Sequence, residues 1–278
     1  MDIAAKAVVT TIEQENLIPV TPILHNANSP VDGAAQLAVH RYDPNTISML
    51  SDCVLINYAA GLSHHSHTDY TPIARLVSVY YGVFVKWDSL YTTLEDLIED
   101  VKNSPGKSSM AGGPIDDHVC LGLLFSKAGI DLNKIDYQSF SGGLEASRLV
   151  LENSSKALVT AVDDVIELIE ERKLRPLAIS SEERMGDILA DYPTFRQAGV
   201  ELAWENFRLV VGGPNMSANA VESWQDVFSK MVRTPTWQNV LQKYRWVDAF
   251  KIEDLQNFLE EKQTLTNEVV PMLGIDFR

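Results

Sequence analysis

Hydrophobic positions recur along the chain with two different periods. A spacing of three to four residues predicts helices, whereas alternating or continuous apolar runs predict strands. The first pattern predicts helices over 2–16, 34–39, 92–102, 115–128, 143–152, 163–172, 217–232, 235–243 and 252–272. The second predicts strands over 18–24, 46–50, 73–85, 107–111, 135–140, 157–162, 175–181 and 207–211.

The alternation of strands and helices predicts an α/β protein, with parallel sheets covered by helices on both faces. A chain of 278 residues favours two lobes. Because no linker divides it, we expect the backbone to cross between lobes within Val79–Val85 and Phe207–Val211. Lobe one is then 1–83 with the C-terminal helices of 213–278, and lobe two is 84–212. Ligands of open α/β sheets bind at the carboxyl ends of strands, so we expect a cleft between the lobes.

Composition narrows the choice of partners. A formal charge of −15 argues against nucleic acid, which needs a basic face. No run approaches the roughly 18 apolar residues that span a bilayer, so direct membrane insertion is not expected. The start at Met1 and Asp2 lacks the charged-then-apolar pattern of an export signal. Cys53 and Cys120 are expected to be thiols, because a bond between them would tie the lobes together.

The stretch from Ser109 to His118 carries the clearest candidate chemistry. Gly112 and Gly113 lie on a predicted strand-to-helix turn, where backbone N–H groups and the helix dipole favour an anion. The alternative is an ordinary turn that uses Gly-Gly-Pro. His118 follows at the start of the helix, where a structural, hydrogen-bonded role is favoured.

Residues 61–70 contain His64, His65 and His67. Closely spaced imidazoles suit a transition metal, but the sequence offers no further ligands at a fixed spacing nearby. A solvated loop is therefore favoured, and neither a metal nor a cofactor is predicted.

Several short motifs occur in an order and spacing that resemble a known family. They are Asp69–Leu76, Thr93–Leu97, Pro105–Lys107, Asp117–His118, Ser141–Ala146, Lys173–Ala178, Tyr192–Phe195, Ala198–Gly199 and Asn206–Arg208, with Trp237 and Trp246. Together they cover about residues 20–275. In this respect the chain resembles the solute-binding proteins of tripartite tricarboxylate transporters, the Bug or TctC family.

The resemblance implies a type II periplasmic-binding-protein fold, with two αβ lobes joined by two crossing strands around a ligand cleft. It implies a periplasmic, monomeric protein without catalytic residues, which delivers a small mono-, di- or tricarboxylate to membrane permease subunits. Backbone amides of strand-to-helix turns would hold the carboxylate. The implied ligand-binding residues are Ser51, Asp52, Cys53, Ala111, Gly112, Gly113, Pro114, Ile115, Asp116, Asp117, Ser141, Gly142, Gly143, Ala161, Val162 and Asp163.

The sequence departs from the family pattern at two places. Asp2 matches the end of the family's first carboxylate loop, so the export signal, the first strand and that loop are expected to be missing. Asp116 and Asp117 stand where small hydroxyl residues are common. Since a carboxylate repels a carboxylate ligand, we expect these side chains to cap the helix or to point away. Glu145 is likewise expected to cap the helix that follows Ser141–Gly143.

Two other classes of protein remain open at this point. A ligand-sensing module would use the same fold without transport, but no DNA-binding segment accompanies it here. An enzyme on this fold would need a nucleophile and a base, and neither His118 nor Cys53 has an identifiable partner.

Overall fold

The computed structural model of the chain describes residues 2–27, 29–104 and 106–275. It separates into two compact units, each built from segments that are distant in sequence. Unit 1 contains the chain up to Ser78 together with Phe207–Asn267, and unit 2 contains Val79–Asn206 together with the described residues from Glu268 onward. Two strands, β2 (Thr71–Lys86) and β7 (Glu205–Gly212), run from one unit into the other, which confirms the two predicted crossing strands.

The remaining elements divide between the units. Unit 1 contains β1 (Ile47–Leu50), β8 (Val247–Lys251), α1 (Asp2–Gln14), α2 (Pro30–Ala38), α3 (Cys53–Ala59), α8 (Ala218–Met231), α9 (Pro235–Tyr244) and most of α10 (Leu255–Val269). Unit 2 contains β3 (Ser108–Gly112), β4 (Ile135–Ser139), β5 (Ala157–Ala161), β6 (Leu174–Ile179), α4 (Leu94–Asn103), α5 (Ile115–Lys127), α6 (Gly143–Leu151) and α7 (Val162–Glu170). Short 3₁₀ turns are η1 (His67–Asp69), η2 (Leu132–Lys134), η3 (Asp187–Leu189) and η4 (Val270–Leu273).

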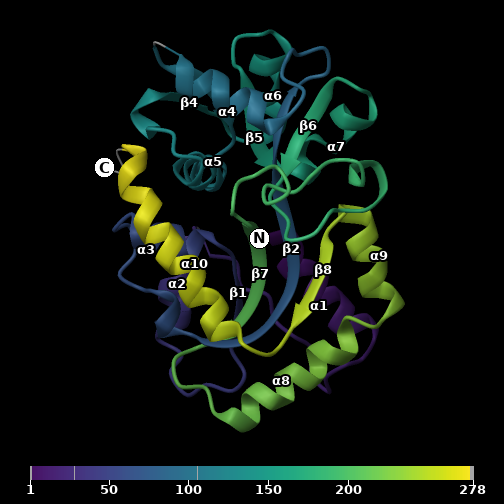
Figure 1. The fold of residues 1–278 in the computed structure, drawn as a ribbon. Helices are drawn as coiled ribbons and strands as arrows, with labels where there is room; N and C mark the ends of the chain where they lie inside the picture. The colour runs from purple at the N-terminus through teal and green to yellow at the C-terminus, as the bar shows by residue number, and fades with distance from the viewer. Residues whose placement is uncertain (1, 28, 105, 276–278) are drawn as a thin grey trace. The chain divides into compact units, whose positions relative to one another are not determined.

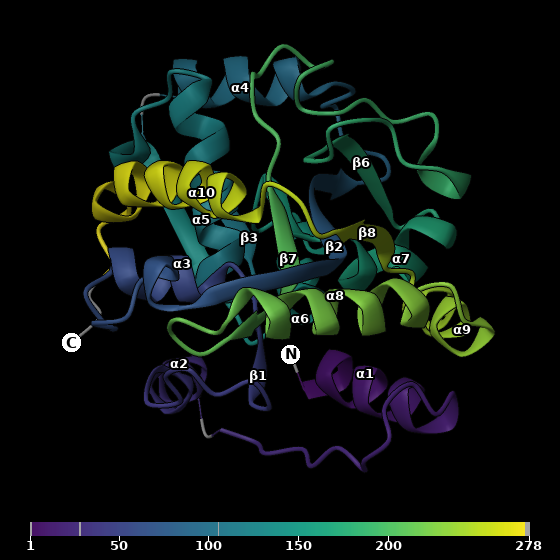
Figure 2. The ribbon, with the colours of Figure 1, turned by 90° about the horizontal axis from the view of Figure 1, so that it is seen from below.

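Unit 1 is a sheet in the order β1–β7–β2–β8 with helices on both faces (Figure 1). Alternate side chains of β7 enter different clusters, as the two-residue period of a strand requires. Leu209 and Val211 pack with residues of α2, α3 and α10. Val210 packs with residues of α1, α8 and α9. Figure 2 shows α1 lying beside α9, in agreement with their contacts.

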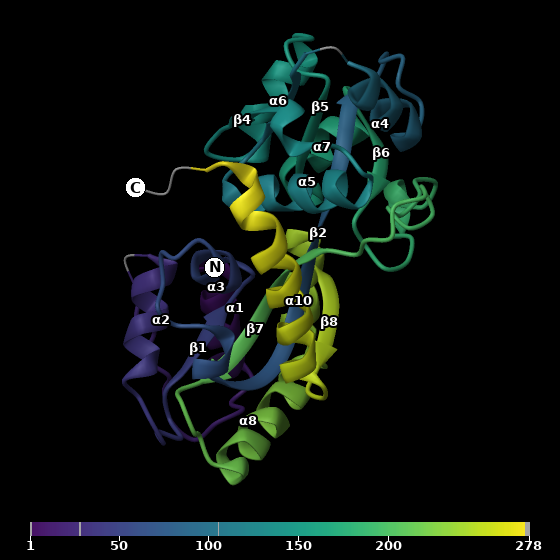
Figure 3. The ribbon, with the colours of Figure 1, turned by 60° about the vertical axis from the view of Figure 1, so that its left-hand side comes forward.

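Unit 2 is a sheet in the order β6–β2–β5–β3–β4. The three strands β5, β3 and β4 are parallel, whereas β2 is antiparallel to both β5 and β6. Helices α4, α5, α6 and α7 lie around these strands (Figure 3). Apolar residues of α6 and α7, including Ala146, Val150 and Val165, pack on Phe84, Ala111 and Leu158 of the strands.

Three predictions about the fold are wrong. Residues 18–24 form no strand, because Pro19 and Pro22 lack the N–H groups that a strand ladder needs, and Val20 and Ile23 are exposed. β8 was not predicted, and the helix predicted over 252–272 begins only at Leu255. The third wrong prediction is strand direction: β1 with β7 and β2 with β8 in unit 1, and β2 with β5 and β6 in unit 2, pair antiparallel instead of parallel.

The helices begin in two different ways. The side chains of Ser29, Thr93, Ser217 and Thr234 cap α2, α4, α8 and α9 by accepting a backbone hydrogen bond. The residues at the same position of α5, α6 and α7 are Pro114, Gly142 and Ala161, and none of them caps through its side chain. These three helices all follow the parallel strands of unit 2.

Within the described ranges, no helix is both long enough and apolar enough to cross a bilayer.

Candidate functional site

The carboxyl ends of β5, β3 and β4 lie at one edge of the unit 2 sheet, because these strands are parallel and in register. Gly112 on β3 pairs with Val159 on β5 and with Ser139 on β4. Each strand is followed within a few residues by α7, α5 or α6 respectively. The predicted turns Ala111–Asp117, Ser141–Gly143 and Ala161–Asp163 are therefore brought together, and we refer to these three turns as the carboxyl edge.

Two glycines allow the backbone at the carboxyl edge to pack closely. A Cβ on Gly112 would lie 2.2 Å from the Tyr137 hydroxyl and 2.7 Å from the Val159 carbonyl oxygen. A Cβ on Gly113 would lie 2.7 Å from the Asp117 carboxylate and 3.3 Å from Gly142 Cα. Glycine is therefore required here by close approach, and both of these φ angles lie outside the left-handed region.

The peptide after Gly113 is held by two hydroxyl groups that sequence reasoning did not identify. Tyr137 Oη and Ser139 Oγ each donate to the Gly113 carbonyl oxygen at 2.9 Å. Both residues belong to β4 and are two positions apart, so the strand period places them on one face. That spacing is the signal that could have found them.

The two aspartates at the start of α5 occupy different environments. Asp117 is 3% exposed, and its Oδ2 accepts a hydrogen bond from Gly113 N at 2.6 Å. Burial, and next the neighbouring Asp116 carboxylate, raise the pKa of Asp117 well above its ordinary value. Asp116 Oδ2 accepts hydrogen bonds from Asn206 Nδ2 at 3.2 Å and from Tyr81 Oη at 3.4 Å. Asp117 therefore holds the turn that precedes α5, and its hydrogen bond reaches Gly113, outside the helix.

The starts of α6 and α7 repeat the arrangement. Glu145 Oε2 accepts hydrogen bonds from Ser141 Oγ at 2.6 Å and from Ser141 N at 3.3 Å, and so holds the turn just before α6. Asp164 Oδ2 on α7 accepts a hydrogen bond from Gly143 N on α6 at 3.0 Å, which joins the starts of the two helices. Asp164 was missed because the prediction stopped at Asp163, although acids are favoured throughout the first turn of a helix.

The remaining predicted residues differ in location and exposure. Ser51, Asp52 and Cys53 belong to unit 1, where they lead into α3. Ser51 and Asp52 are buried and Cys53 is partly buried, with Cys53 N donating to Ser51 Oγ at 3.3 Å. The buried residues of the carboxyl edge are Ala111, Gly112, Gly113, Asp117, Gly143 and Val162. The exposed ones are Pro114 and Ser141. Intermediate exposure is found for Ile115, Asp116, Gly142, Ala161 and Asp163. Whether each contacts a ligand stays a prediction.

His118 stacks on Tyr137 next to the carboxyl edge. The two ring centroids are 3.9 Å apart and the planes are 6° from parallel. Burial lowers the pKa of His118 to about 4, so the imidazole is neutral near pH 7. A cavity of about 250 Å³ lies beside this stack, lined by His118, Leu121, Gly122, Leu132, Ile135, Asp136, Tyr137, Leu273, Gly274 and Ile275. None of the predicted ligand residues lines it.

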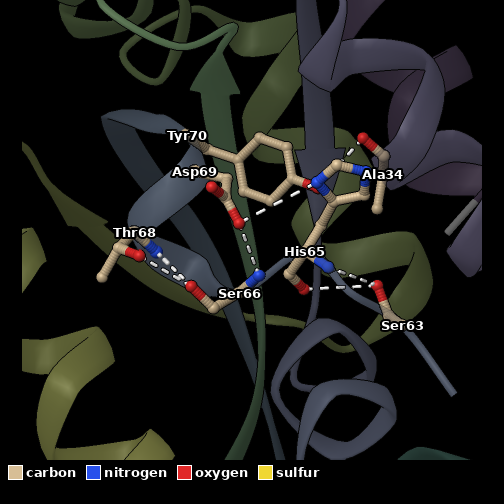
Figure 4. A network of polar contacts seen from close by, with 7 residues as sticks. All are labelled: Ala34, Ser63, His65, Ser66, Thr68, Asp69 and Tyr70. Atoms are coloured by element: carbon tan, nitrogen blue, oxygen red, sulfur yellow. Dashed lines mark hydrogen bonds and ion pairs between the residues drawn. The ribbon is translucent and has the colours of Figure 1, made fainter. Parts of the chain in front are cut away.

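The His-rich loop of unit 1 is less solvated than predicted. His67 is 4% exposed, and its Nε2 lies 2.9 Å from Glu260 Oε2. Figure 4 shows the neighbouring network, in which Ser66 N donates to Asp69 and Tyr70 Oη donates to the Ala34 carbonyl oxygen. These contacts fold the loop onto the unit. Across the part of the chain that the structure describes, no group of three or more His, Cys, Asp or Glu residues is arranged to hold a metal ion.

The two-unit α/β fold with two crossing strands is that of a periplasmic binding protein. Residues 23–274 match the tripartite tricarboxylate transporter family receptor, TctC, and the chain belongs to this family. A curated relative, the UPF0065 protein in the gbd 5′ region of Cupriavidus necator, is 24% identical over 178 residues. That match covers 63% of this chain and only 53% of the relative, so it spans about half of the relative's length.

Solved structures show the same fold at low sequence identity. A TctC solute-binding protein from Polaromonas superposes with a TM-score of 0.87 at 18% identity, covering 97% of this chain and 93% of that one. Rpa4515 from R. palustris, solved with adipate, gives 0.74 at 17% identity, covering 99% and 93%. MatC from Rhodopseudomonas palustris, solved with malate, gives 0.68 at 16% identity, covering 96% and 92%.

Substitution of Gly113 tests the carboxyl edge. In Gly113→Val, the new side chain must displace the Asp117 carboxylate, which a Cβ alone would approach to 2.7 Å. We expect carboxylate affinity, measured by titration calorimetry, to fall at least about tenfold, or 1.4 kcal/mol. Circular dichroism should show that the fold persists. Gly186→Ala is the matched control, because a Cβ there meets nothing within 4 Å. Unchanged affinity in Gly113→Val would remove this turn from the site.

Proposed function

We propose that the protein is an extracytoplasmic receptor that captures a small carboxylate and delivers it to the permease of a tripartite tricarboxylate transporter. The observation that carries the proposal is the family match over residues 23–274. Relatives of the same fold were solved with adipate and with malate, both of them dicarboxylates. The ligand class proposed for this chain is accordingly a mono-, di- or tricarboxylate, bound without catalysis in the periplasm by a monomer.

The chemistry of the carboxyl edge supports this proposal. Three helices begin there, and backbone N–H groups in the first turn of a helix lack partners within that helix. Together with the helix dipoles, such N–H groups bind anions without a cationic side chain. In unit 2, the proposed contacts with the carboxylate ligand are Ala111–Asp117, Ser141–Gly143 and Ala161–Asp163. Ser51, Asp52 and Cys53 are proposed contacts from unit 1.

A thermal-shift screen tests the function. The protein is melted alone and with each member of a panel of mono-, di- and tricarboxylates from two to six carbons. A ligand at 100 times its dissociation constant stabilises the folded state by about 2.7 kcal/mol, so at least one carboxylate should raise the melting temperature by several degrees. Uncharged diols and diamides of the same lengths are the controls. If no carboxylate shifts the transition at 10 mM, roughly 100 times a 0.1 mM dissociation constant, the proposal is wrong.

The same samples distinguish a receptor from an enzyme. Proton NMR of the stabilising carboxylate, incubated with the protein overnight, should show an unchanged ligand. Appearance of a product would contradict the receptor assignment.

A further inference from the structure

The cavity beside the stacked rings of His118 and Tyr137 lies wholly within unit 2 and is bordered by four elements. It has a volume of about 250 Å³ and is lined by residues of α5, η2, β4 and the end of η4. Beside it η4 packs directly on α5, because a Cβ on Gly122 would lie 2.5 Å from Leu273 Cδ2. An apolar cavity of about 150 Å³ can bind benzene, so this one has room for a single ring with a small substituent.

The lining of the cavity favours an uncharged occupant. No lysine or arginine is among the described residues that line it. Tyr137 faces α5 through its stack on His118, so the two-residue period of β4 places the Asp136 side chain on the other face of the strand. Burying a charge without a partner costs far more than burying an uncharged polar group. The aliphatic lining residues are Leu121, Leu132, Ile135, Leu273 and Ile275.

His118 provides hydrogen-bonding capacity on the wall of this cavity. Its ring stacks on Tyr137, but neither ring nitrogen makes a hydrogen bond to any residue within the described ranges. Because burial lowers the pKa of His118 to about 4, the imidazole is neutral at pH 7.5 and offers one donor and one acceptor. An occupant with a hydroxyl or amide group can use them, whereas a hydrocarbon cannot.

Tyr137 joins the cavity wall to the carboxyl edge. Its Oη donates to the Gly113 carbonyl oxygen at 2.9 Å, and a Cβ on Gly112 would lie 2.2 Å from the same hydroxyl. The hydroxyl is therefore packed against both glycines without free space between them. In so closely packed a region, the position of the ring determines the position of the turn.

From these contacts we infer that the cavity is a second ligand site, for a small uncharged molecule with one ring and a hydroxyl or amide group, whose binding raises carboxylate affinity through Tyr137. An occupant fixes the ring and so the turn at Gly113, which lowers the ordering cost of carboxylate binding. The site itself does not depend on the proposed function, whereas its effect on affinity rests on that function.

Methyl NMR locates the site. The probe is benzyl alcohol, added to protein with labelled leucine and isoleucine methyl groups at pH 7.5. We expect the resonances of the five aliphatic lining residues to shift, with a dissociation constant of about 1 mM or below, as a ligand of this size can reach in a preformed cavity. Benzylamine and benzoate carry the same ring with a charge of either sign. Both should shift these resonances at least about tenfold more weakly, because a buried charge finds no partner there.

His118→Phe tests the hydrogen bond, because phenylalanine can keep the stack on Tyr137 but has no ring nitrogen. The native protein should bind benzyl alcohol about three- to tenfold more tightly than toluene, the gain expected from one hydrogen bond. In His118→Phe this ratio should fall to about one. An unchanged ratio would remove His118 from the site.

The effect on affinity is measured by titration calorimetry. A carboxylate that stabilises the protein is titrated with and without saturating benzyl alcohol. We expect its affinity to rise at least about threefold, and by linkage the carboxylate should raise the affinity for benzyl alcohol by the same factor. Leu132→Trp fills the cavity and should abolish both the methyl shifts and the effect. Leu90→Trp is the matched control, because Leu90 is 94% exposed and does not line the cavity.

The outcomes separate this inference from the proposed function. Unshifted lining resonances at about 10 mM benzyl alcohol, or tighter binding of benzylamine or benzoate there, would overturn the site. Binding in the cavity without a rise in carboxylate affinity would overturn its effect on the carboxyl edge. If no carboxylate binds while the lining resonances still shift, the receptor function fails and the second site remains. Should Leu132→Trp not fold, the native shifts and His118→Phe still decide.

Discussion

Gly143→Ala is expected to lower the free energy of unfolding by about 3 kcal/mol, the upper part of the range for overpacking a core. The added Cβ would lie 2.0 Å from Thr160 Oγ1 and 2.6 Å from Thr160 Cβ. Thr160 is fully buried on β5, so it has no room to move away. The displacement would also disturb Asp164, which accepts from Gly143 N and lies 3.5 Å from Thr160 Oγ1. Urea denaturation followed by tryptophan fluorescence and circular dichroism measures the change.

The neighbouring glycine provides the control for stability. A Cβ on Gly142 would come no closer than 3.9 Å to any atom outside its neighbours, and the backbone there is extended, with φ −178°. The free energy of unfolding of Gly142→Ala should therefore lie within about 0.5 kcal/mol of the native value, as is usual for surface substitutions. Equal stability of the two variants would show that the start of α6 is not packed against β5 as described.

The sequence was sufficient to predict the order of elements in unit 2. Most of its helices and strands bury an apolar face, so hydrophobic periodicity indicates them directly. The pattern does not encode strand direction. β2 runs antiparallel to β5 and β6, although the alternation of elements suggested parallel neighbours throughout. β8 was missed because Val247–Lys251 is short and only half buried, which leaves a weak apolar signal.

For the candidate site, the sequence predicted the turns but not their internal contacts. Gly-Gly-Pro between a strand and a helix is a local signal, and the structure places that turn beside Ser141–Gly143. The contacts of Gly113 with Tyr137 and Ser139 join residues more than twenty positions apart. Such pairs depend on strand register, which a single sequence does not specify. Asp117 shows the same limit, because its burial follows from the packing of α5.

His118→Phe is expected to make the protein more stable in acid. The pKa of His118 is lowered by burial to about 4, against about 6.5 for the unfolded chain. Between these values the unfolded chain binds a proton that the folded protein does not. The stability due to neutral His118 is therefore complete above about pH 6.5 and is lost as the pH falls toward 4. At pH 5 the loss is about 2 kcal/mol, and phenylalanine, which keeps the stack on Tyr137, avoids it.

Asp117 also makes the free energy of unfolding depend on pH, but in the opposite direction, and it is present in both proteins. The difference between the variant and the native protein therefore isolates the effect of His118. Its raised pKa makes the folded protein bind a proton more tightly than the unfolded chain, so its contribution falls as the pH rises above about 4. In the native protein, the pH dependence of stability due to His118 and that due to Asp117 partly cancel. Urea unfolding at pH 5.0 and 7.5 should show that His118→Phe gains about 2 kcal/mol over the native protein between the two conditions. A pH-independent difference for His118→Phe would mean that the imidazole is protonated equally in the folded and unfolded states.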